Sequence, residues 1–193
     1  MDSKDKKRIA IFASGNGSNF EAIAKACAEG RIDAEVVLCV TDKPGAYVVT
    51  RAARFGVPVV EFRPKDFASK AEFETMLLGH LREKGVDLIC LAGYMRIIGD
   101  VLLNAYEGRI INIHPSLLPA FQGADAIGQA MKYGVKVYGI SIHFVDQTLD
   151  GGKIIAQTAI PYEGSDRDEL ETLVHAQEHI LYPATVQKLL SSL

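Results

Sequence analysis

Apolar runs alternate with helical patterns over the first two-thirds of the chain. Runs rich in β-branched residues predict strands at Arg8–Ala13, Glu35–Val40, Val57–Glu61, Val86–Leu91 and Arg109–Ile113. Between these runs a helix is predicted over Asn19–Glu29, with Ser18 as its candidate cap. A second helix begins with the capping-box spacing of Ser69 and Glu72 and places Phe73, Met76, Leu77 and Leu81 on one face. This alternation is typical of a doubly wound, mainly parallel sheet.

The last third of the chain has a different pattern. Two strand-like runs, Tyr138–Val145 and Lys153–Ile160, are joined by a short polar segment and predict an antiparallel pair. A final helix is predicted from about Asp166, and Pro183 is expected to break or kink it. No linker or repeat separates these parts. The predicted fold is therefore an α/β domain over residues 1–193, with a doubly wound, mostly parallel sheet, an antiparallel C-terminal strand pair and a terminal helix.

Composition narrows the class of protein. The 21 basic and 24 acidic residues are interspersed and give a net charge of -3, so no broad basic surface for nucleic acid is expected. The first apolar run, Ile9–Ala13, is too short for a signal peptide or a membrane span, which favours a cytoplasmic location. Cys27, Cys39 and Cys90 lie far apart in apolar surroundings. They predict buried thiols rather than disulfides or a metal site.

Polar residues with catalytic potential follow the fifth predicted strand. Asn112 and His114 are two positions apart, so in an extended segment their side chains project to the same side. Pro115 restricts His114 to extended geometry and favours a strand end there, at the edge where α/β sheets bind ligands. Asp150 precedes two glycines, Gly151 and Gly152, that permit a tight turn toward the histidine. A lone Asn-x-His is more often structural, with the imidazole hydrogen-bonded at a strand end, so the interpretation depends on the whole set.

The segment Ser14–Asn19 lies between the first strand and its helix. Its two glycines can turn the chain so that backbone N–H groups face an anion, helped by the helix dipole. Phe20 replaces the third small residue of a dinucleotide fingerprint, and the Gly-Lys-Ser/Thr of a P-loop is missing. A seat for a single phosphate is the favoured interpretation, and a flexible glycine turn without a ligand is the alternative.

Several longer motifs together resemble one family. They are Ala13–Asn19, Leu91–Ile98, Asn112–Phe121, His143–Gly152 and Gln177–His179. In this order and spacing they resemble the folate-dependent formyltransferases, in particular the members that act on a glycinamide ribonucleotide. The resemblance covers nearly the whole chain and implies a Rossmann-like fold. It also implies transfer of a formyl group from 10-formyltetrahydrofolate to the amine of phosphoribosylglycinamide in purine synthesis, without a metal.

The resemblance assigns residues to three roles. The catalytic set is Asn112, His114 and Asp150; the folate-binding set is Lys70, Met95, Arg96, Ile97, Ile98 and Asn112; the ribonucleotide-binding set is Gly17, Ser18, Asn19 and Glu178. Lys70 stands where some relatives have an arginine that contacts the folate. Lysine keeps the charge but lacks the planar guanidinium, so the alternative is a solvated surface lysine without a folate contact. Apolar core packing is the alternative for Met95, Ile97 and Ile98. A solvated helix charge is the alternative for Glu178.

Two assignments near the catalytic set stay open. His143 lies inside a predicted strand, where a packed, hydrogen-bonded histidine is as plausible as a substrate contact. The segment Phe121–Asp125 matches the family only in part and receives no catalytic role.

Three other functions share part of this pattern of residues. A formyltetrahydrofolate hydrolase uses similar groups with water as acceptor, but resembled hydrolases have His-His-Ser where this chain has His114-Pro115-Ser116. Methionyl-tRNA formyltransferase needs an RNA-binding region with a basic face. A non-catalytic nucleotide-binding module has no need for Asn112, His114 and Asp150 together. The expected binding partners are small-molecule substrates, with no nucleic acid and no membrane. The expected oligomeric state is a monomer or a homodimer.

His175 and His179 fit the inverted zinc-protease pattern, with two histidines four apart on one helix face. Such a site needs a third protein ligand, and the residues that follow offer none of the usual types. The pattern is therefore interpreted as part of the formyltransferase motif around Glu178.

Overall fold

The computed structural model describes residues 6–192, and its strands form one seven-stranded sheet in the order β3-β2-β1-β4-β5-β6-β7. The strands are β1 (Lys7–Phe12), β2 (Ala34–Thr41), β3 (Val59–Glu61), β4 (Leu88–Leu91), β5 (Ile110–His114), β6 (Val137–Phe144) and β7 (Ile154–Pro161). Strands β1 to β5 pair in parallel, whereas β5–β6 and β6–β7 are antiparallel. The predicted fold class is confirmed, including the antiparallel pair near the C-terminus.

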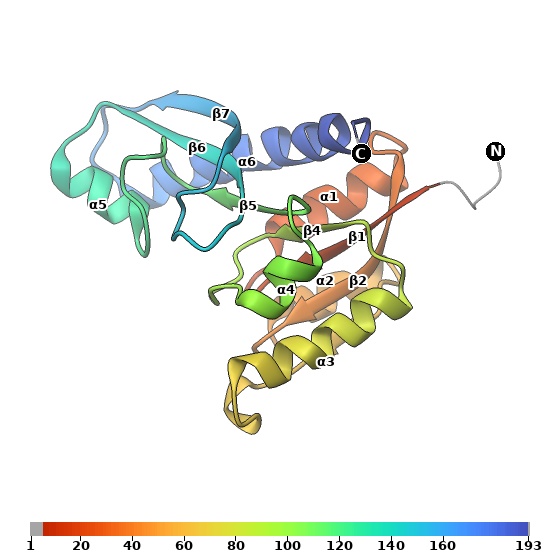
Figure 1. Ribbon diagram of the computed structural model, residues 1–193. Coiled ribbons are helices and arrows are strands. Elements are labelled where there is room, and N and C mark those ends of the chain that lie inside the picture. The colour runs from red at the N-terminus through yellow and green to blue at the C-terminus, as the bar shows by residue number, and fades with distance from the viewer. Residues whose placement is uncertain (1–5, 193) are drawn as a thin grey trace.

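Helices cover both faces of the sheet (Figure 1). They are α1 (Ser18–Ala28), α2 (Tyr47–Arg54), α3 (Lys70–Glu83), α4 (Asp100–Ala105), α5 (Ala126–Tyr133) and α6 (Arg167–Leu190), with a short 3-10 helix at Pro64–Asp66. One hydrophobic cluster joins α1, α2 and α6 to one face of the sheet, and a second joins α3 and α4 to the other. A third cluster lies between α5, β6, β7 and the start of α6.

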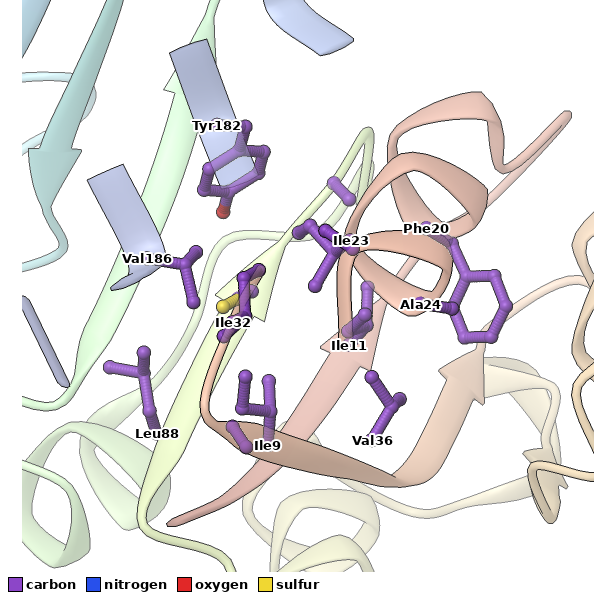
Figure 2. Packing of buried hydrophobic residues seen from close by; sticks show 14 of the residues in the cluster. Ile9, Ile11, Phe20, Ile23, Ala24, Ile32, Val36, Leu88, Tyr182 and Val186 are labelled. Atoms are coloured by element: carbon purple, nitrogen blue, oxygen red, sulfur yellow. The ribbon is translucent and has the colours of Figure 1, made fainter. Parts of the chain in front are cut away.

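The alternation of side chains along β1 explains these two layers. Ile9 and Ile11 belong to the cluster under α1 and α6, whereas Ala10 and Phe12 belong to the cluster under α3. All four are fully buried, as expected for an inner strand of a sheet covered on both faces. Figure 2 shows Ile9 and Ile11 with Leu88, Tyr182 and Val186 in the first cluster.

Of the two outcomes expected at Pro183, a break is wrong, because α6 is one helix from Arg167 to Leu190, and a kink stays a prediction. The residues around the proline are firmly packed: Tyr182 and Val186 are fully buried, and Pro183 is buried as well. The Tyr182 hydroxyl also donates to the backbone oxygen of Leu91 (2.8 Å), at the end of β4. Burial of this helix face offsets the loss of one helical hydrogen bond at Pro183.

Helix starts differ in part from the sequence-based expectation. Ser69 caps α3 as predicted, since its hydroxyl accepts the Glu72 N–H (3.2 Å). Ser18 does not cap α1: it is the first helical residue, and the cap position is Gly17 in the left-handed conformation (φ +75°). The chain needs this glycine conformation to turn from β1 into α1. Helices α2, α4 and α5 have no counterpart among the predicted segments.

The cysteines are free thiols, as predicted. Cys39 and Cys90 are fully buried and Cys27 is partly buried. Burial raises the pKa of Cys27 to about 11 and that of Cys39 to about 12, which makes both poor nucleophiles at neutral pH. Within residues 6–192, no helix is both long enough and apolar enough to cross a membrane.

Candidate active site

A cleft of about 780 Å³ opens at the carboxyl edge of the parallel strands. It is lined by the loops that follow β1, β4 and β5, together with the loop after β6 and the side of α6. Strand β1 lies between β2 and β4, so the chain order reverses at β1, and loops on either side of it diverge and leave a crevice. The topology therefore places the cleft where doubly wound sheets bind ligands.

The loop after β1 forms one end of the cleft. Gly17 has a positive φ of +75°, and a Cβ added there would lie 2.5 Å from Cγ2 of Val48. Both the backbone conformation and the close contact therefore require glycine. Ser18 and Asn19 follow as the first residues of α1, where N–H groups have no partner within the helix and the helix dipole is positive. This geometry fits an anion seat at Gly17, Ser18 and Asn19.

A buried network ties this loop to the segment after β4. The Ser14 hydroxyl donates to Oδ1 of Asp42 (2.5 Å) and accepts the N–H of Met95 (2.8 Å). The guanidinium of Arg96 pairs with the other oxygen of Asp42 through Nε (3.0 Å). Nε of Arg96 is thus held by Asp42, which directly follows β2. Arg96 would contact a ligand through its backbone or through its remaining N–H groups.

The segment Met95–Ile98 supplies an apolar wall. Met95 is 68% exposed and Ile97 is 63% exposed, although both line the cleft, whereas Ile98 is buried. The alternative that Met95 and Ile97 belong to the core is therefore wrong. Exposed apolar side chains beside free backbone polar groups suit a flat heterocycle with polar edges.

Strand β5 carries Asn112 and His114 on the same side of the sheet, as predicted, and both line the cleft. His114 is buried, and its Nε2 donates to the backbone oxygen of Phe121 (2.8 Å), because a carbonyl can only accept. Its Nδ1 lies 3.5 Å from Oδ2 of Asp150. One ring nitrogen of His114 is thus held by a carbonyl, and the other faces a carboxylate.

Asp150 reaches the histidine from the loop between β6 and β7. Its Oδ2 accepts the N–H of Gly123 (2.8 Å). Burial opposes ionisation, but the contact with His143, the Gly123 N–H and the charge of His114 outweigh it, so the pKa of Asp150 lies below its usual value. The carboxylate is therefore ionised at neutral pH, and its negative charge faces Nδ1 of His114.

The turn at Asp150 differs from the sequence-based interpretation. Asp150 itself has the positive φ (49°), whereas Gly151 and Gly152 do not. The glycines are needed for space: a Cβ on Gly151 would meet the Thr148 side chain, and one on Gly152 would collide with the carbonyl of Phe144. A left-handed aspartate is uncommon and is held here by the contacts of its carboxylate.

His143 belongs to the same cluster, which sequence reasoning left undecided. It pairs directly opposite Asn112 across β5 and β6, and Nδ2 of Asn112 lies 3.3 Å from its Nε2. The other ring nitrogen, Nδ1, donates to the Phe144 carbonyl (2.8 Å). Because Nδ1 carries the proton that it donates, Nε2 can accept from the Asn112 amide, and Oδ1 of Asp150 lies 3.7 Å from the same nitrogen. The antiparallel register is what brings His143 to the site.

Glu178 of α6 completes the opposite wall. It is buried, and its Oε2 accepts from Nδ2 of Asn19 (2.9 Å) and contacts Nδ1 of His175 (2.9 Å). The contact with Glu178 raises the pKa of His175, although burial works against the charge. The alternative of a solvated charge at Glu178 is therefore wrong, because this carboxylate bridges α1 and α6 at the cleft.

Lys70 is the predicted site residue that the structure does not bring to the cleft. It is the first residue of α3, is exposed, and its side chain runs beside Gly99 and Glu74. The other predicted residues, Gly17 to Asn19, Met95 to Ile98, Asn112, His114, Asp150 and Glu178, all line it. Among residues 6–192, no group of His, Cys, Asp and Glu side chains is arranged to hold a metal ion.

Fold and cleft together define a doubly wound α/β protein whose cleft combines the glycine loop Ser14–Asn19, an apolar wall and an Asn–His–Asp group. Residues 7–186 match the family model described as Formyl transferase, so the chain belongs to the formyl transferase family. It is 54% identical to the phosphoribosylglycinamide formyltransferase of Bacillus subtilis (strain 168) over 187 residues, which make up 95% of each protein. It is also 36% identical to a part, 18%, of the human trifunctional purine biosynthetic protein adenosine-3, with 95% of this chain covered.

Solved structures give the same relationship. The glycinamide ribonucleotide transformylase 1 of Geobacillus kaustophilus superimposes with a TM-score of 0.93 at 52% identity, with 95% of this chain and 98% of that chain covered. The phosphoribosylglycinamide formyltransferase of Bacillus halodurans gives 0.93 at 53% identity, with 96% of each chain covered. Both superpositions therefore cover nearly the whole of this chain.

Proposed function

We propose that residues 1–193 act as a single cytoplasmic domain that transfers the formyl group of 10-formyltetrahydrofolate to the amine of phosphoribosylglycinamide. The products are formylglycinamide ribonucleotide and tetrahydrofolate, in purine biosynthesis. The observation that carries this proposal is the meeting of Asn112, His114 and Asp150 between an anion loop and an apolar wall. The high identity to proteins named for this activity supports it.

The reaction moves an acyl group between two nitrogens. The substrate amine attacks the formyl carbon, a new C–N bond forms, and negative charge gathers on the formyl oxygen. The bond from carbon to the folate nitrogen then breaks, and the attacking nitrogen loses a proton while the departing nitrogen gains one. The site must therefore supply donors to an oxyanion and a path for one proton.

The residues of β5 suit both tasks. The second amide N–H of Asn112 can donate to the oxyanion. Nε2 of His114 is held by the Phe121 carbonyl, so the Nδ1–H of a cationic His114, 3.5 Å from Asp150, is the charged donor and the proton source. Asp150, ionised and 3.5 Å from His114, stabilises that cation. His143 holds the Asn112 amide by accepting from its nitrogen.

The rest of the cleft suits the two substrates. The phosphate is assigned to the N–H groups of Gly17, Ser18 and Asn19, and the ribose hydroxyls to Glu178. Both contacts made by Glu178 to residues of the described chain fall on Oε2, so Oε1 can accept from a hydroxyl. The pterin is assigned to the wall formed by Met95, Arg96, Ile97 and Ile98, and Asn112 adjoins it.

A formyltetrahydrofolate hydrolase is the second candidate, because the same residues would activate transfer to water. The two are separated by supplying 10-formyltetrahydrofolate with and without phosphoribosylglycinamide and following the release of tetrahydrofolate. Release that requires the ribonucleotide amine is the expected result. Equal release in its absence would favour the hydrolase, and no release with either acceptor would contradict formyl transfer.

A further inference from the structure

The anion loop is held from outside the cleft by one side chain of α2. Arg51 donates from Nε to the backbone oxygen of Asn16 (2.8 Å) and from Nη2 to Oδ1 of the same residue (2.8 Å). Its third nitrogen, Nη1, pairs with Glu21 in the first turns of α1. The side chain is only 16% exposed, and its face covers the ring of Tyr47 at 4.9 Å.

Each of these contacts fixes a different part of the turn between β1 and α1. The two hydrogen bonds to Asn16 fix the orientation of the peptide group between Asn16 and Gly17. The pair with Glu21 anchors the helix whose N-terminal N–H groups face the cleft. Beside them, the Val48 N–H donates to the Gly15 carbonyl (3.1 Å). A planar guanidinium is suited to such a two-pronged contact, because its donors have fixed directions.

Arg51 does not line the cleft, and all three of its nitrogens have partners within the protein. Because it stays outside the cleft, Arg51 does not contact a phosphate bound there and can act on it only through the loop. We propose that Arg51 is a positioning residue: by clamping Asn16, it pre-orients the Gly17–Asn19 N–H groups and so determines the preference for a phosphorylated over an unphosphorylated ribosyl substrate. This inference rests on the proposed function, in which that loop holds the phosphate.

The test compares Arg51→Met with two further variants. Arg51→Lys keeps the charge but loses the fork. Arg54→Met is the matched control: Arg54 lies on the same helix and contacts the same two side chains, Tyr47 and Glu21, but does not touch Asn16. Each variant is assayed with phosphoribosylglycinamide and with the ribosylglycinamide that lacks the phosphate, and KM and kcat are separated. Circular dichroism and thermal melting confirm folding.

Loss of a charge-assisted clamp predicts about a tenfold rise in KM for the phosphorylated substrate in Arg51→Met, with kcat changed by no more than about threefold. KM for the folate and kcat/KM for the unphosphorylated substrate should stay near wild type, so the preference for phosphate falls about tenfold. Arg51→Lys should lose most of this preference as well. Arg54→Met should retain it.

Three results would overturn the inference: an unchanged phosphate preference in folded Arg51→Met, full rescue by Arg51→Lys, or an equal loss in Arg54→Met. If Arg51→Met does not fold, Asn16→Ala decides instead. It removes one of the two acceptors and should lower the phosphate preference several-fold, and no change would overturn the proposal. Failure of the proposed function is distinct, because the wild-type protein would then turn over neither substrate.

Discussion

Replacing Asp150 with asparagine removes a charge from the centre of the site and preserves its shape. The carboxylate lies 3.5 Å from Nδ1 of His114 and accepts the Gly123 N–H at 2.8 Å. An asparagine oxygen can still accept from Gly123, so the turn should survive. The cationic form of His114, however, loses its opposite charge. We expect Asp150→Asn to fold normally and to lose activity chiefly at neutral and alkaline pH.

The size of the loss follows from the distance. Two unit charges 3.5 Å apart interact by about 5 kcal/mol at an effective dielectric constant of about 20. Solvent reaches part of the pair, since the Asp150 side chain is 11% exposed, and the Phe121 carbonyl still stabilises the ring. About half of that energy, roughly 2 to 3 kcal/mol, corresponds to a loss of about 30- to 150-fold in rate at neutral pH.

The pH dependence has a definite sign. The pKa of Asp150 is depressed, so the wild-type carboxylate stays ionised at all pH values well above that pKa. The asparagine variant removes the charge over that whole range. Without that charge a positive His114 ring is less stabilised, so the residual activity should shift toward acid.

The assay is the pH profile of kcat/KM for formyl transfer from pH 5 to 9, together with an NMR titration of the His114 ring in the folded variant. Asp146→Asn is the matched control, because Asp146 lies in the same loop but its carboxylate is held by Thr148. The control should keep the wild-type profile. An Asp150→Asn profile that falls equally at every pH, or a ring titration identical to that of the wild type, would refute the electrostatic role of Asp150.

Three further predictions concern other parts of the site. Asn112→Ala should lower kcat about 10²- to 10³-fold with both KM values little changed, as steady-state kinetics can measure, because one oxyanion donor is lost. Turnover within a few-fold of wild type would contradict that role. Gly17→Ala should weaken ribonucleotide binding about tenfold or more in calorimetry, because its φ is positive and Val48 leaves no space, whereas Gly15→Ala should have a smaller effect, since Gly15 has neither constraint. Equal effects would refute the conformational argument. His175→Gln should destabilise the protein at about pH 6 by less than about 1 kcal/mol, because the ring is half exposed. The pKa of His175 is raised in the folded state, so this contribution is present below the unfolded value and disappears as pH rises through the folded one; thermal melting curves should therefore converge at about pH 9, and a gap that widens with pH would contradict it.

The features that sequence could predict depend on local patterns. Asn112 and His114 share a side because alternation along a strand is fixed, and the turn between β1 and α1 follows from its glycines. His143 could not be assigned, because its place depends on the antiparallel register that sets it opposite Asn112. That register is a long-range property of the fold.

Long-range packing also explains the errors. Pro183 does not break α6, because the helix face around it is buried against the sheet. Ser18 does not cap α1, because the turn between β1 and α1 places Gly17, in the left-handed conformation, at the cap position. No sequence motif marks Arg51, because its hydrogen bonds to Asn16 join residues 35 positions apart. Its partner Glu21 lies in another helix, and only the fold brings the two together.

The position of α6 has a consequence for the order in which the protein acquires its structure during synthesis. A ribosome makes all seven strands before it makes α6, yet this helix covers Ile9, Ile11 and Leu88 through Tyr182 and Val186. Until residues beyond about 167 emerge, only α1 and α2 cover that face of the nascent sheet, the apolar area that α6 buries stays open, and Glu178 is missing from the cleft. The partly made chain should therefore expose an apolar surface and bind chaperones. Ligand recognition should begin only after α6 docks.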